Sequence, residues 1–302
     1  MKLRRIAFIC CMIFTAVLFI DGLRYITIIN SKLNEKYIEK PKTSKSGKKG
    51  SLGSARPINI IILGLDEEQV RSDVITLFNY DPMKSKLNIL SIARDTMVYH
   101  KGRRMKINAL IGTGGEKLII EKVEEMTGLT IDYYLTVNFS GFRKIIDILG
   151  GVELDVPFNM NYDDPEQNLH IHLNKGRQIL DGDKAEQFVR YRKGNTPGQG
   201  YTEGDLGRVK AQQVFLKELV EQKVRLKYLL KADDVFLTLE QNSKTNISLS
   251  DISFYYKYLK NVNSVEIQTY TTPGDSGYVN GLWYFIYDEL KTREMVENKF
   301  FH

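Results

Sequence analysis

The sequence predicts an α/β domain with a mixed central sheet, preceded by an N-terminal transmembrane helix. Apolar runs at residues 58–65, 74–80 and 87–92 are typical of strands that are covered on both faces. Segments with helical spacing of apolar residues alternate with further strands downstream, which favours helices layered against one sheet. A separate apolar stretch at residues 6–29 opens the chain.

This opening stretch is interrupted by only two charged residues, Asp21 and Arg24. It is long enough to span a bilayer if these two side chains reach the outer interface. No small-x-small cleavage pattern follows it, so we expect an uncleaved anchor. Basic residues before the stretch favour a cytoplasmic N-terminus, which places the large domain that follows outside the cytoplasm.

The chain is therefore expected to have four parts. These are a short cytoplasmic start at 1–5, the anchor at 6–29, a tether at 30–56 and an extracytoplasmic catalytic domain at 57–302. The tether is rich in Lys, Ser and Gly and has no apolar period, which is typical of a flexible linker. Its lysines oppose the proposed orientation, but large domains are translocated largely regardless of such charges.

Composition excludes several classes of protein. The formal net charge of +6 is modest, and no basic helix interleaved with aromatic residues is present, so nucleic-acid binding is disfavoured. Both cysteines, Cys10 and Cys11, lie in the opening apolar stretch. The outer domain therefore has no disulfide and no cysteine-based metal site, and must rely on its hydrophobic core.

Further elements are expected along the domain from apolar spacing and from glycine stop signals. A helix ending at Gly128 and another ending at Gly150-Gly151 are the clearest of these. The expected helices are 116–126, 139–149, 205–224 and 284–296, and the expected later strands are 133–137, 152–156 and 265–271.

Charged residues gather at the ends of the three apolar strands. Asp66 follows the first strand, Arg71 and Asp73 precede the second, and Arg94 and Asp95 follow the third. Ligands of open α/β sheets bind at strand ends, so this placement predicts a site. The two carboxylates Asp66 and Asp73 suit Mg²⁺, which is held by one or two carboxylates together with phosphate oxygens. The alternative is that they cap turns or pair with Arg71.

A second polar group lies downstream. Arg190 and Arg192 are two residues apart, so an extended backbone would place both on one face. Asp205, Arg208 and Gln212 have the i, i+3, i+7 spacing of one helical face. Guanidinium groups match phosphate oxygens bidentately, so several converging arginines predict a diphosphate site. Surface ion pairing is the alternative for any single arginine.

Other motifs give less information about function. The glycine-rich segment at 112–117 has the wrong spacing for a P-loop, and no Gly-x-Ser-x-Gly nucleophile motif is present. His170 and His172 alternate as strand residues do, and we favour a structural role for them over a metal site.

Six short motifs in this order resemble the LytR-CpsA-Psr family: Gly64-Leu65-Asp66, Arg71-Ser72-Asp73, Ser91-Ile92-Ala93-Arg94-Asp95-Thr96, Lys106-Ile107-Asn108, Arg190-Tyr191-Arg192, and Gly204-Asp205-Leu206-Gly207-Arg208 through Gln212-Gln213. The resemblance covers residues 58–223, with a weaker echo at 272–284. It implies a three-layer α/β/α sandwich that binds polyprenyl-pyrophosphate glycans outside a Gram-positive cell membrane. It also implies transfer of teichoic acid or capsular polysaccharide from this donor onto peptidoglycan.

The resemblance also implies roles for individual residues. Asp66 and Asp73 would hold Mg²⁺, for which Mn²⁺ could substitute, and Asp205 would support the helix face. Asp95 is either the general base or a positioning group for Arg94; Arg71 and Arg94 would assist catalysis. The residues implied to contact the pyrophosphate are Arg71, Arg94, Lys106, Arg190, Arg192, Arg208 and Gln212.

Two other functions use the same site. A hydrolase would cleave the lipid pyrophosphate with water instead of a sugar hydroxyl. A non-catalytic sensor would bind it and regulate wall metabolism, and would need the arginines but not the carboxylates. A transcriptional regulator is disfavoured, since no helix-turn-helix pattern is found.

Overall fold

The computed structural model describes residues 56–66, 68–165, 169–196, 198–223, 235, 238, 242–247 and 265–301. The predicted cytoplasmic start and anchor, and all of the tether but Arg56, lie outside these residues. In the part of the chain that the structure describes, no helix combines the length and apolarity that crossing a membrane requires.

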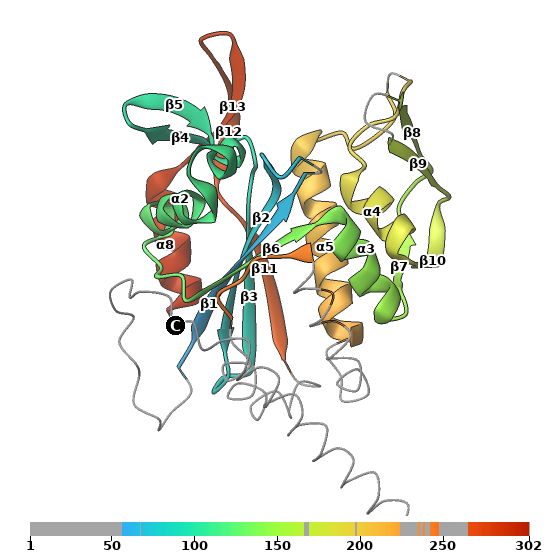
Figure 1. The fold of residues 1–302 in the computed structure, drawn as a ribbon, viewed down its shortest axis with the longest axis horizontal. Helices are drawn as coiled ribbons and strands as arrows, with labels where there is room; N and C mark the ends of the chain where they lie inside the picture. The colour runs from blue at the N-terminus through green and yellow to red at the C-terminus, as the bar shows by residue number, and fades with distance from the viewer. Residues whose placement is uncertain are drawn as a thin grey trace, which may run out of the picture. The chain divides into compact units, whose positions relative to one another are not determined.

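A five-stranded mixed sheet forms the centre of the domain (Figure 1). Its strand order is β11-β3-β2-β1-β6. β1 pairs antiparallel with β2 and parallel with β6, while β3 pairs antiparallel with β2 and parallel with β11. The strands are β1 (Ile58–Leu65), β2 (Ser72–Asp81), β3 (Lys86–Ile92), β6 (Tyr133–Asn138) and β11 (Glu266–Thr271). The predicted α/β class with a mixed central sheet is confirmed.

Helices α2 (Leu110–Thr127) and α8 (Glu289–Phe300) flank the sheet together (Figure 1). Their buried side chains join those of β1, β2 and β3 in one core, which we call the first core. Its fully buried members include Ile61, Leu63, Leu77, Ile119 and Val296. α2 ends at Gly128, whose φ of 72° is the left-handed conformation that favours glycine.

Helices α3 (Phe139–Ile148), α4 (Gly182–Arg190) and α5 (Asp205–Lys223) lie to the other side of the sheet (Figure 1). Asn138 and Asp181 cap α3 and α4 by accepting hydrogen bonds from backbone N–H groups in the first turn. These helices share a second core, which is richer in aromatic side chains. Its members include Phe188, Tyr191 and Phe215.

Four short two-stranded sheets surround this framework. They pair β4 (Met97–His100) with β5 (Arg103–Lys106), β7 (Val152–Val156) with β10 (Gly176–Leu180), β8 (Met160–Asp164) with β9 (Leu169–Leu173), and β12 (Gly274–Val279) with β13 (Leu282–Tyr287). A 3-10 turn, η1 (Ile107–Ala109), leads from β5 into α2.

The expectation of a helix at 284–296 is wrong in its first part. Residues 282–287 form β13, and α8 begins only at Glu289, after the N-cap Asp288. Asn280 and Gly281 both have positive φ, the conformation of a two-residue hairpin turn, so they fold β13 back onto β12. The single tryptophan, Trp283, lies on this hairpin with 62% of its surface exposed.

Candidate functional site

The ends of β1 and β2 bring the two predicted metal ligands to one edge of the sheet. The β1–β2 ladder pairs Gly64 with Val74 and Leu65 with Ser72, so Asp73 is the extra residue of a β-bulge. A bulge commonly re-aims a side chain next to a functional site. Asp73 faces a pocket, while the Oδ1 atom of Asp66 accepts hydrogen bonds from the backbone N–H groups of the turn that follows β1.

The pocket has a volume of about 240 Å³. It lies where the start of β2, the loop after β3, and helices α3, α4 and α5 meet the β8–β9 hairpin. Five basic side chains and a single carboxylate line it, so the lining has a strong positive excess. The lining residues are Asp73, Val74, Arg94, Phe139, Tyr162, Leu169, Val189, Arg190, Arg192, Lys193, Arg208 and Gln212.

Six of the residues predicted from the sequence therefore lie in one pocket: Asp73, Arg94, Arg190, Arg192, Arg208 and Gln212. Arg190 and Arg192 reach it differently from the prediction. Arg190 is the last residue of α4, and Tyr191 after it is extended. Both arginines still line the pocket because the chain turns out of the helix between them.

Three ion pairs position the arginines. Arg94 Nη1 lies 2.6 Å from Asp73 Oδ1, and Arg208 Nη2 lies 2.6 Å from Asp205 Oδ1. Arg190 Nη1 donates to the nearly buried Glu186 at 2.7 Å, and its guanidinium lies 4.5 Å from the centre of the Phe139 ring. These contacts fix each guanidinium and leave other N–H groups of the same planes to bind an anion.

The pKa values of two arginines show the field inside the pocket. Burial alone lowers the pKa of Arg94, but the neighbouring carboxylates, led by Asp73, outweigh it and raise that pKa. The pKa of Arg208 is lowered, first by burial and then by the positive charge of Arg94, with Arg192 adding to the effect. Because guanidinium groups stay protonated in proteins, Arg208 is a buried cation that Asp205 stabilises and the neighbouring arginines repel.

Two buried donors make the site receptive to an anion. The Nε atoms of Arg94 and Arg208 are buried and have no hydrogen-bond partner among the described residues. Leaving a charged donor unpaired in the interior costs free energy that a bound anion would recover. Clustered guanidiniums with unsatisfied donors are suited to a group with several phosphate oxygens.

The remaining predicted residues lie outside the pocket lining. Lys106 Nζ lies 2.9 Å from Asp95 Oδ1, so these two residues pair with each other. The Asp95 carboxylate still raises the pKa of Arg94, which shows that it is close to the edge of the site. Arg71 is exposed, and its backbone closes the turn with Asp66.

The sequence analysis missed Glu186, Lys193, Phe139, Tyr162 and Leu169. Glu186 binds Arg143 as well as Arg190, and so joins α3 to α4. The i, i+4 spacing of Glu186 and Arg190 was a signal for this pair. The other four residues reach the pocket through tertiary contacts that no local pattern shows.

Fold and pocket together define an α/β protein with a basic pocket lined by guanidinium groups at the edge of a mixed sheet. The chain belongs to the LytR-CpsA-Psr family, since the LytR_cpsA_psr family model matches residues 24–300.

Characterised relatives cover most of the chain. A protein of Bacillus cereus, the polyisoprenyl-teichoic acid–peptidoglycan teichoic acid transferase TagU, is 30% identical over 92% of this chain and 91% of its own. TagV of Bacillus subtilis, with the same activity in its name, is 28% identical over 94% of this chain and 74% of its own.

Solved structures share the fold. The crystal structure of B. subtilis TagV has a TM-score of 0.68 and 27% identity, covering 82% of this chain and 98% of that one. A structure of TagT bound to LI-WTA has a TM-score of 0.63 and 25% identity, covering 86% and 92%. The family predicted from the six motifs is confirmed.

Proposed function

We propose that this chain is a transferase that moves a polyprenyl-pyrophosphate-linked anionic glycopolymer, of the teichoic acid or capsular polysaccharide class, onto peptidoglycan through a phosphodiester. The observation that carries the proposal is the pocket of converging guanidiniums with buried, unpartnered Nε donors. The names of the relatives support teichoic acid as the polymer and peptidoglycan as the acceptor.

The pyrophosphate would lie among Arg94, Arg190, Arg192 and Arg208. These side chains bind its oxygens and neutralise the charge that shifts to the leaving group as the bond breaks. Gln212 is held by its own hydrogen bond to the carbonyl of Val189, so its carboxamide keeps a fixed direction at the pocket wall. Arg71 and Lys106 are proposed to assist from the rim.

The residues present fit a Mg²⁺ ion. Asp73 is the only carboxylate among the residues that line the pocket, and one carboxylate with phosphate oxygens is a usual Mg²⁺ environment. Asp66, at the same end of the β1–β2 pair, is proposed as the second ligand. A bound Mg²⁺ would supply further neutralisation of the pyrophosphate charge. Mn²⁺ would fit the same oxygen ligands.

The proposed reaction is a displacement at phosphorus. A sugar hydroxyl oxygen of peptidoglycan forms a bond to the glycan-proximal phosphorus, the pyrophosphate P–O bond breaks, and polyprenyl phosphate leaves. The hydroxyl proton passes to a base, for which Asp95 is the candidate. The proximity of the Asp95 carboxylate to Arg94, whose pKa it raises, supports its other role, which is to position Arg94.

The proposed reaction also implies where the protein is located in the cell. The lipid donor lies in the membrane and the acceptor lies outside it, so we propose that residues 6–29 are a single-pass anchor with the N-terminus inside. Residues 57–302 would then be the extracytoplasmic catalytic domain of a Gram-positive cell envelope. Its helices on both sides of the sheet support the three-layer α/β/α description.

A transfer assay tests the proposal. The full chain in detergent is incubated with a polyprenyl-pyrophosphate glycan, Mg²⁺ and peptidoglycan oligomers, and the products are read by mass spectrometry. Glycan joined covalently to the acceptor is the expected result. Free glycan phosphate without conjugate would identify a hydrolase, and tight binding without turnover would identify a sensor.

A further inference from the structure

The β8–β9 hairpin carries a second polar group on the face that does not take part in the pocket. The register pairs Asp163 with His170 and Asn161 with His172, so all four side chains lie on one face. The opposite face is fixed by burial, because Met160, Ile171 and Leu173 belong to the second core. Asp163, His170 and His172 are all exposed and so can be reached by an ion from solvent.

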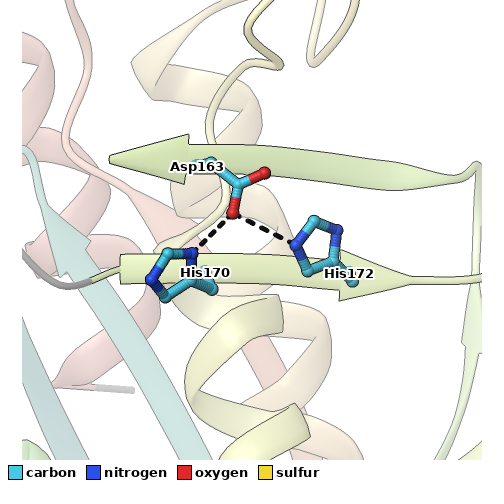
Figure 2. A group of neighbouring side chains, drawn as sticks. All are labelled: Asp163, His170 and His172. Atoms are coloured by element: carbon cyan, nitrogen blue, oxygen red, sulfur yellow. Dashed lines mark hydrogen bonds and ion pairs between the residues drawn. The ribbon is translucent and has the colours of Figure 1, made fainter. Parts of the chain in front are cut away.

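One carboxylate oxygen is the meeting point of both imidazoles (Figure 2). His170 Nδ1 lies 2.6 Å from Asp163 Oδ1, and His172 Nε2 lies 3.1 Å from the same oxygen. An ordinary cross-strand pair needs one histidine, whereas here two rings on the same strand turn toward one atom. We propose that Asp163, His170 and His172 form a binding site for a transition-metal ion of the Zn²⁺ class.

The chemistry of the ligands selects the ion. Imidazole nitrogens suit Zn²⁺, Cu²⁺ and Ni²⁺, while Mg²⁺ and Ca²⁺ prefer oxygen ligands. Two histidines and a carboxylate leave the fourth tetrahedral position to water, as in many sites with three protein ligands. Ligand atoms around Zn²⁺ lie about 3.3 Å apart, and the three ligand atoms here lie within 4.8 Å of one another, so shifts of ~1 Å would admit the ion.

Neighbouring groups already hold these ligands in place. The Oδ1 atom of Asn161 lies 3.4 Å from His172 Nδ1, the ring nitrogen that faces away from Asp163. A partner of this kind orients the ring of a metal-binding histidine. The Asn195 side chain bonds both the N–H and the carbonyl of Asp163, at 2.7 and 2.9 Å, and so fixes the backbone of the central ligand.

The metal would act as a clamp on the pocket wall. Tyr162 and Leu169 come from the same two strands and line the phosphate pocket, and Lys193 lines it from the segment that Asn195 ties to β8. A bound ion would cross-link β8 to β9 and restrain both from the outside. The metal site itself does not depend on the proposed transfer reaction.

The test is a metal titration. The full chain in detergent, without a polyhistidine tag, is titrated with Zn²⁺ against a chromogenic chelator, with excess Mg²⁺ present to occupy oxygen-rich sites. One Zn²⁺ ion per chain is expected. His170→Ala and His172→Ala should each weaken it by about 10- to 100-fold or more, since losing even a partner of a ligand has an effect of that size.

His100→Ala is the matched control, because His100 lies on β4, away from the hairpin, and should leave Zn²⁺ affinity unchanged. If all three variants bind Zn²⁺ as tightly as the native chain, or if His100→Ala weakens Zn²⁺ binding as much as the other two, the proposed site is wrong. The histidines would then only form cross-strand pairs with Asp163. Pyrophosphate binding by His172→Ala without Zn²⁺ shows that the variant is folded.

Amide hydrogen exchange tests the clamp. Exchange in residues 160–173 should slow with Zn²⁺ in the native chain and not in His172→Ala. Unchanged exchange in the native chain would show that the ion does not restrain the hairpin.

Discussion

The two faces of the central sheet are built for different purposes. The first core, under α2 and α8, is almost entirely aliphatic and fully buried. The side that carries α3, α4 and α5 has aromatic side chains and buried charges such as Arg208 and Glu186. One face therefore supplies stability through packing, while the other accepts the electrostatic cost of holding an anion site. Substitutions should separate the two.

The largest expected effect is on stability, from the first core. Leu77 is fully buried at the centre of β2, so Leu77→Ala should lower the free energy of unfolding by about 2–5 kcal/mol. Urea denaturation followed by circular dichroism measures this. Leu290→Ala, at an 82% exposed position on α8, is the control and should change it by less than about 0.5 kcal/mol. If the folded fraction of Leu77→Ala loses pyrophosphate affinity, the first core does not act on stability alone and the difference between the two sides is contradicted.

Arg208→Ala should have the largest effect on chemistry. It removes a buried guanidinium with an unpartnered Nε, and transfer should fall by about 10²–10³-fold. Arg208→Lys keeps the charge but not the planar fork, so it should recover only part of the loss. Lys210→Ala, which breaks only an exposed ion pair with Glu203 in the turn before α5, is the control in the same assay. Equal rates for Arg208→Ala and Lys210→Ala would contradict the pocket assignment.

Asp73→Asn tests the proposed metal ligand. Transfer should fall by about 10- to 100-fold, and the remaining activity should no longer respond to a chelator. Isothermal titration with Mg²⁺ and a pyrophosphate analogue measures the affinity directly. Asp66→Asn should lower the Mg²⁺ affinity less than Asp73→Asn does, because one oxygen of Asp66 already accepts hydrogen bonds from the backbone of its turn. A chelator effect that persists in Asp73→Asn would exclude this residue as the ligand.

The smallest effect comes from a helix cap. Asp181→Ala removes the N-cap of α4 and should lower the free energy of unfolding by about 1 kcal/mol. Because α4 ends at Arg190 in the pocket, pyrophosphate affinity should weaken as well. Asp288→Ala removes the cap of α8, on the other side of the sheet, and should weaken folding while leaving that affinity unchanged. Both are read by thermal melting and by calorimetry with pyrophosphate.

The sequence predicted what local chemistry decides. Apolar runs located β1, β2 and β3, and glycine signals located the end of α2 at Gly128. Asp73 and Arg94, predicted from strand ends, lie in one pocket because neighbouring strand ends must meet at one edge, whereas Arg71 does not line it.

What the sequence could not predict depends on distant partners. The ion pair of Asp95 with Lys106 is set by the β4–β5 hairpin, whose register no strand-end rule gives, and the choice between general base and positioning group for Asp95 stays a prediction. The helix expected from residue 284 failed because the pairing of β13 with β12 overrides its apolar spacing. The turn residues Asn280 and Gly281 were the local signal for that pairing.

The position of Trp283 gives the molecule a built-in optical reporter. The only indole of the chain is exposed on the β12–β13 hairpin, with its centre 5.4 Å from the ring of Tyr278. Its emission should already be that of a water-exposed indole in the folded protein, so unfolding will change the emission maximum little. A blue shift of the Trp283 emission maximum would instead indicate that a binding partner or membrane covers the hairpin. Tryptophan fluorescence can therefore report binding at this hairpin but reports unfolding poorly.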